Sequence, residues 1–154
     1  MRVSVDIEGL DKIKNIGPAI PKSIFEMVRF VAHEVHIRMA AYPPETHANQ
    51  PGPYPERWYQ RHFGQRWARL DGSTGGNDTS EQLQKSWREV VVGPLTREVW
   101  TDVSYAPYVQ SAEYQSGVMR VIGWQTDEEV VEEVMNDARI QRRIDAAIDS
   151  ALEA

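Results

Sequence analysis

One segment, which begins at Thr79, constrains the fold more than any other because its pattern changes from helical to extended within a short length. Thr79 can cap a short helix, and Gln82, three residues later, can return the hydrogen bond of a capping box. Residues 90–92 and 98–103 have the composition of strands, and Gly93-Pro94 between them predicts a turn. A helix followed by a β-hairpin indicates an α+β fold.

Two periodic patterns precede that segment. Apolar and polar residues alternate over residues 3–7, which predicts a half-buried strand that ends at Gly9. From about Pro18 the spacing changes to three and four, which predicts a long amphipathic helix that ends at Tyr42-Pro43-Pro44. Its apolar stripe comprises Ile20, Ile24, Met27, Val28, Val31, Val35 and Met39.

The C-terminal third predicts one more strand and further helix. Residues 118–124 are compatible with a third strand of the hairpin type, in addition to the N-terminal strand. Thr126 and Glu129 form a second capping box, which opens a C-terminal helix. Beyond Asn136-Asp137 the apolar stripe shifts to Ile140, Ile144, Ile148 and Leu152, which predicts a kink or two consecutive helices. We therefore expect a small antiparallel sheet packed against a long N-terminal helix and a C-terminal helix.

The length and composition favour one cytosolic domain. A chain of 154 residues fits a single domain over residues 1–154. Cysteine is absent, which agrees with a reducing compartment. Neither a membrane-spanning run nor a signal peptide is apparent, so no membrane partner is expected. The net charge of −6 argues against a chain that is mainly a nucleic-acid binder, because phosphate affinity comes from clustered Lys and Arg.

Residues 43–78 differ in composition from the rest of the chain. Their prolines exclude a continuous helix or central strand, so we expect an extended loop or arm. Aromatic residues at helical spacing predict a short helix over about residues 56–70, and the Gly-rich residues 71–78 predict a loop. Aromatic and arginine side chains are enriched at interface hot spots and also stack on bases. The candidate interface residues here are Arg57, Trp58, Tyr59, Arg61, Phe63, Arg66, Trp67 and Arg69.

Three interpretations of this aromatic and arginine segment stay open. The preferred one is packing on a neighbouring subunit, followed by packing in the core of the same chain. The third is nucleic-acid binding, in which residues 57–69 would serve an accessory DNA- or RNA-binding module.

An acidic group could complement the arginines across a subunit edge or simply form a solvated face. It comprises Asp127, Glu128, Glu129, Glu132, Glu133 and Asp137.

Little in the sequence indicates catalysis. His33 and His36 are three residues apart, whereas the zinc-protease template needs two histidines four apart with a glutamate between them. We interpret both as solvent-facing or hydrogen-bonded histidines. The glycines of residues 72–76 lack the Lys-Ser or Lys-Thr of a phosphate-binding loop, and no nucleophile elbow is present. The expectation is a protein without catalytic residues, metal ligands or cofactors.

Residues 79–115 carry a family resemblance. Leu83-Gln84-Lys85-Ser86-Trp87, two strands and then Tyr105-Ala106-Pro107-Tyr108-Val109 resemble the signature of the minor tail-component and tail-completion family of tailed bacteriophages. The resemblance implies a small α+β structural subunit of the virion and not an enzyme. Under this resemblance Trp87, Tyr105 and Tyr108 are either core residues or anchors between subunits, and we favour the core for Trp87 and Tyr105. Tyr108 and Tyr114 are interface candidates.

The resemblance also implies a location and a set of partners. The expected place is the neck or tail of a virion assembled in the cytoplasm of a bacterial host. Copies of the chain would form a ring of roughly six or twelve subunits at the head–tail junction or tail end. Expected partners are neighbouring neck, portal-side and tail-tube proteins, with DNA close by in the channel.

Overall fold

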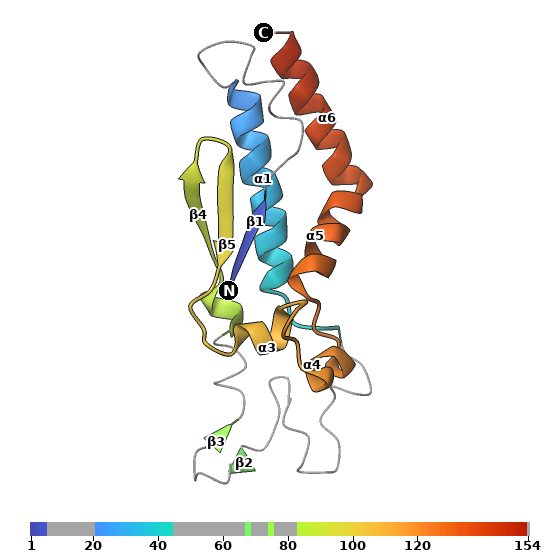
Figure 1. Cartoon of the computed structure of the whole chain (residues 1–154). Coiled ribbons are helices and arrows are strands. Elements are labelled where there is room, and N and C mark those ends of the chain that lie inside the picture. Colours follow the sequence, from blue (N-terminus) through green and yellow to red (C-terminus); the bar gives the residue numbers. More distant parts are fainter. Residues whose placement is uncertain (6–20, 45–66, 69–73, 76–82, 154) are drawn as a thin grey trace. The chain divides into compact units, whose positions relative to one another are not determined.

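The computed structural model describes residues 1–5, 21–44, 67–68, 74–75 and 83–153 (Figure 1). These residues form an α+β fold with a small three-stranded antiparallel sheet and several helices, as predicted. No helix among them combines the length and the apolar character needed to cross a membrane. The chain groups into two compact units. The first comprises Met1, Met39–Trp87 and Thr101–Asp127, and the second comprises Arg2–Arg38, Arg88–Trp100 and Glu128–Ala154.

The second unit contains the sheet, in the strand order β1-β5-β4. β4 (Arg88–Gly93) and β5 (Thr96–Trp100) are antiparallel and form the predicted hairpin. The second strand ends at Trp100 and does not reach residue 103 as predicted. The ladder ends there because Trp100 lies opposite Arg2 and Arg88, the first residues of the two flanking strands.

The predicted N-terminal strand is the third member of this sheet. β1 (Arg2–Val5) is antiparallel to β5, and Val3 lies opposite Val99. Both valine side chains are buried, as the alternating pattern requires of one sheet face. The strand end predicted at Gly9 lies outside the described residues.

The long N-terminal helix is α1 (Lys22–Met39). It ends a few residues before Pro43, in agreement with the helix-breaking effect of the proline pair. Ile20, the first residue of the predicted stripe, lies outside the described residues. The rest of the stripe is almost completely buried, and it comprises Ile24, Met27, Val28, Val31, Val35 and Met39.

Within the second unit, α1 packs between the sheet and α6 (Ala138–Leu152) (Figure 1). On the sheet side, the Arg97 guanidinium of β5 lies 5.5 Å from the centre of the Phe25 ring. On the helix side, the Ser23 hydroxyl donates a hydrogen bond of 3.2 Å to the Ala147 carbonyl. Contacts on two sides explain why so much of α1 is buried.

The C-terminal region forms two consecutive helices, one of the two outcomes predicted. α5 (Asp127–Asn136) is followed by α6, and Asp137 caps α6 by accepting a hydrogen bond of 2.8 Å from the Arg139 N–H. The change of stripe reflects this break. Ile144 is buried, but Leu152 is exposed, so the predicted stripe does not extend to the end of the helix.

Residues 118–124 are not the strand that was predicted. They belong largely to α4 (Gly117–Ile122), a helix of the first unit. Ile122 is the buried residue of this helix, whereas Val118 and Val121 are exposed. Gly123 ends the helix with φ of 99°, and the Trp124 N–H donates to the Met119 carbonyl at 3.1 Å, a C-terminal capping arrangement that favours glycine.

The segment 43–78 is described only in part. β2 (Trp67–Ala68) and β3 (Thr74–Gly75) form a short antiparallel ladder in the first unit. The helix predicted to about residue 70 is therefore wrong at its end, and the loop predicted for residues 71–78 contains a strand. Tryptophan is enriched in strands, and strand pairing here overrides the helical spacing of the aromatic residues. The extended arm stays a prediction.

Candidate functional site

The Tyr-Ala-Pro-Tyr-Val motif lies at the start of α3 (Ala106–Gln110) in the first unit. Pro107 is in the first turn, where its missing N–H removes no helical hydrogen bond. The Ala106 and Val109 side chains are buried, whereas Tyr108 is 62% exposed. The short motif thus contributes to the core and presents an aromatic ring to solvent.

Two buried hydrogen bonds hold Gln110, the last residue of α3, in place. The Trp87 indole N–H donates to Oε1 of Gln110 at 3.3 Å, and the Gln110 amide donates to the Met39 carbonyl at 2.9 Å. Trp87 is buried, which confirms its predicted core position. Tyr105 is only half-buried. Burial raises the pKa of Tyr105, and a hydrogen bond with the Leu83 backbone opposes part of this shift.

The segment after the motif is held by its own hydrogen bonds. The Gln115 amide donates to the Val109 carbonyl at 2.8 Å and to the Trp124 carbonyl at 2.7 Å. The Ser116 N–H donates to the Tyr108 carbonyl at 2.9 Å. These hydrogen bonds join α3 to the start and the end of α4. They fix the backbone from which the exposed side chains of this segment project.

Four large apolar or aromatic side chains of this segment are exposed, and we name them the α3–α4 surface. They are Tyr108, Tyr114, Val118 and Val121, of which Tyr114 is 57% exposed. The adjacent Glu113 carboxylate raises the pKa of Tyr114 by hydrogen bonding and by charge. Tyrosine is a residue type enriched at interface hot spots, so Tyr108 and Tyr114 make this surface a candidate for a contact.

The other candidate interface residues lie between residues 57 and 69, where the structure describes no side chain. Trp67 is in β2, but its side chain lies outside the described part of the chain. The remaining residues of the group also lie outside the described part of the chain. Their packing or nucleic-acid role therefore stays a prediction. They are Arg57, Trp58, Tyr59, Arg61, Phe63, Arg66 and Arg69.

In the second unit, α1 and β4 bring together two imidazoles and a carboxylate, which we name the histidine cluster. Nδ1 of His33 lies 2.9 Å from Oε1 of Glu89, and Nδ1 of His36 lies 3.0 Å from the same oxygen. The imidazole rings are 6.2 Å apart in an edge-to-face arrangement. Both histidines are hydrogen-bonded, as interpreted from the sequence, and they share one acceptor.

The electrostatics of the histidine cluster favour a charged Glu89. Burial raises the pKa of this carboxyl, but the hydrogen bonds and charges of His33 and His36 oppose burial and bring the pKa below its ordinary value. The Glu89 side chain is 20% exposed and that of His33 is 58% exposed. The cluster is therefore anionic at its centre and open to solvent on one side.

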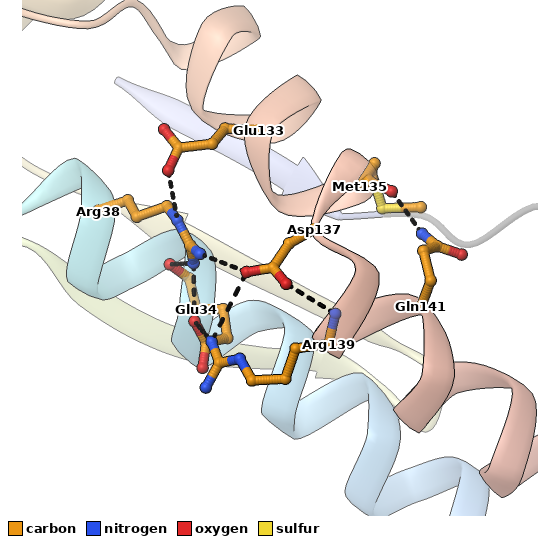
Figure 2. A network of polar contacts seen from close by, with 7 residues as sticks. All are labelled: Glu34, Arg38, Glu133, Met135, Asp137, Arg139 and Gln141. Carbon is orange, nitrogen blue, oxygen red and sulfur yellow. Dashed lines mark hydrogen bonds and ion pairs between the residues drawn. The ribbon is translucent and has the colours of Figure 1, made fainter.

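A second polar cluster on α1 is built from ion pairs, and we name it the Arg38 cluster (Figure 2). The Arg38 guanidinium contacts Glu34 at 2.7 Å, Glu133 at 3.2 Å and Asp137 at 3.2 Å. Arg139 adds a contact of 2.9 Å to the same Glu34 oxygen. These contacts connect α1 with α5 and α6 within the second unit.

The pKa shifts in the Arg38 cluster reflect these contacts. Burial lowers the pKa of Arg38, but hydrogen bonds and charges from Glu34 and Glu133 leave it above its ordinary value. The hydrogen bond from the Arg139 backbone lowers the pKa of Asp137. Two members of the predicted acidic group, Glu133 and Asp137, are thus paired within the chain.

Comparison of the chain with family models, curated proteins and solved structures found no match.

The sequence interpretation named both histidines but missed Glu89. Glu89 is half-buried between exposed neighbours in β4, and nothing in the local sequence indicates this position. Its meeting with His33 and His36 depends on how α1 lies on the sheet, which the sequence pattern does not specify.

Proposed function

We propose that this chain is a structural virion protein of a tailed bacteriophage. It forms part of a ring at the head–tail junction or tail end and joins the DNA-filled head to the tail around the DNA channel. The proposal rests on the resemblance carried by residues 79–115. A non-enzymatic role is part of it.

The observation that carries the proposal is the division of the signature motif between core and surface. Ala106 and Val109 are buried, so they account for the need for small and apolar residues in the motif. Tyr108 has no comparable role in the core because most of its side chain is exposed. Tyrosine is a residue type enriched at interface hot spots, so we assign Tyr108 to a contact between subunits.

The hairpin supplies a second feature that suits assembly. β4 is at one edge of the described sheet, and Val90, Val91 and Val92 on it are all exposed. Exposed valines on an edge strand are an aggregation liability in a monomer, but they are suitable for a strand that packs against a neighbour. In a closed ring, each copy would present one such surface to the next by rotation.

Complementation of phage assembly with Tyr108→Ser tests the proposal. Tailed particles should form with the wild-type chain, whereas the variant should give particles that lack the chain and remain unjoined at the neck or tail. Leu152→Ser is a matched control, because Leu152 is similarly exposed but belongs to α6, outside the signature segment. Normal particles with Tyr108→Ser would contradict the assignment of Tyr108.

A further inference from the structure

We propose that the histidine cluster is a binding site for a divalent transition-metal ion of the zinc type, with His33, His36 and Glu89 as ligands. This inference is independent of the proposed role in the virion. It differs from the sequence-based expectation of a chain without metal ligands, which for these two histidines was argued from their spacing.

The geometry of the cluster is close to that of a metal centre. A ligand atom from each of the three residues lies within 4.8 Å of the other two. In tetrahedral zinc sites the metal lies about 2.0–2.2 Å from nitrogen and oxygen ligands, which places the ligand atoms about 3.3 Å apart. The two Nδ1 to Oε1 distances of 2.9 and 3.0 Å need only a small opening to reach that value.

Two separate elements hold the ligands, so the site does not depend on one flexible segment. His33 and His36 are one helical turn apart and share a side of α1, whose neighbouring residues Ala32 and Val35 are buried. Glu89 is in β4, which pairs with β5 along its length. Ligands on packed helices and strands are held in place before an ion arrives.

The ligand types indicate the class of ion. Imidazole nitrogen with one carboxylate suits zinc, copper, nickel and cobalt, whereas magnesium and calcium prefer sites made of oxygen atoms. No cysteine in the chain competes for the ion. Three protein ligands leave one position of a tetrahedral ion open, and the exposed side of His33 gives water access to it.

The role that follows is a connection between α1 and the sheet. An ion held by both elements replaces hydrogen bonds to Glu89 with metal–ligand bonds. Because the unfolded chain lacks the assembled site, binding stabilises the folded state. The bound ion would also neutralise the anionic carboxylate at this surface.

Titration of the metal-free full-length chain with Co²⁺ tests the site directly. Tetrahedral binding should produce visible absorption bands that saturate at one ion per chain, and Zn²⁺ should displace them. An excess of Zn²⁺ should raise the melting temperature by about 5 °C or more, whereas Mg²⁺ should not. Absence of a saturable Co²⁺ spectrum would overturn the proposal.

Variants identify the ligands. His33→Gln, His36→Gln and Glu89→Gln should each weaken Co²⁺ binding by at least about tenfold. The other two of the four histidines in the sequence are His47 and His62. The double variant His47→Gln/His62→Gln is the matched histidine control and should bind as the wild type does. His33→Gln changes an exposed residue, so it remains informative if Glu89→Gln fails to fold. Unchanged binding in His33→Gln and His36→Gln would show that the ion binds elsewhere.

Discussion

The two polar clusters on α1 use neighbouring residues but are built differently. The Arg38 cluster centres on Glu34, a carboxylate that is only 6% exposed, and its partners are arginines with permanent charge. The histidine cluster centres on Glu89, and its partners are two imidazoles, whose ring nitrogens can also bind metals. The first cluster is suited to holding helices together, and the second to binding a metal ion.

The largest effect should come from the apolar packing that accompanies the Arg38 cluster. Ile144 is buried in α6. Ile144→Asp would bury an unpaired carboxylate, so we expect a loss of about 4 kcal/mol or more in the free energy of unfolding. Ile144→Val should lose only about 1 kcal/mol. Urea denaturation followed by circular dichroism measures both, and equal stability of Ile144→Asp and wild type would show that this face of α6 is not packed.

Removal of the central carboxylate should break the Arg38 cluster itself. Glu34→Ala leaves Arg38 and Arg139 without their shared acceptor, and we expect a loss of about 2–4 kcal/mol. Glu133→Ala removes a half-exposed partner of Arg38 and should lose less than about 1 kcal/mol. If the two variants have similar denaturation midpoints, the cluster does not centre on Glu34.

A smaller effect that depends on pH is expected at the histidine cluster. Glu89→Gln should lose about 1 kcal/mol at about pH 7 in metal-free protein, the usual net value of a hydrogen bond. The folded pKa of Glu89 lies below its ordinary value of 4.5. The stabilisation from charged Glu89 is therefore fully present above the unfolded pKa of this carboxyl. As the pH falls, Glu89 takes up a proton in the unfolded chain first, and the stabilisation is lost as the pH falls through the folded pKa.

Denaturation of wild type and Glu89→Gln at about pH 7 and about pH 3.5 tests this dependence. The stability difference between the two proteins should shrink at the lower pH. A difference that does not shrink on acidification would contradict this dependence.

The success of the sequence interpretation varied with how local the signal was. The buried stripe of α1, the hairpin and the break at Asp137 each depend on neighbours within one or two turns, and all three were predicted. Residues 118–124 were wrongly predicted as a strand: their β-branched residues are typical of strands, but the glycine that follows them ends a helix. Glu89 was missed because its partners are on another element.

The difference between local signals and contacts between elements also explains which surface residues could be predicted. Tyr108 was named from a motif, and the helical start of that motif places its side chain outward. The contacts of Arg38 with Glu133 and Asp137 could not be predicted, because they need the packing of α1 against α5 and α6. Local pattern therefore predicted the elements, and tertiary packing decided the partners.

The smallest effect on stability is expected at Tyr108. Because this side chain is mostly exposed, Tyr108→Ser should change the free energy of unfolding by no more than about 0.5 kcal/mol. Thermal melts of the isolated chain measure this. A loss of several kcal/mol would place Tyr108 in the core, and the failure of its variant in assembly would then have a different cause.

Electron cryomicroscopy of purified phage particles that carry the wild-type chain tests the proposed function most directly. We expect density that fits α1, the β4–β5 hairpin and α6, repeated as a closed ring coaxial with the DNA channel at the head–tail junction or tail end. Tyr108 should lie in a contact with a neighbouring subunit or protein. Absence of the chain from complete, infectious particles would contradict the proposal.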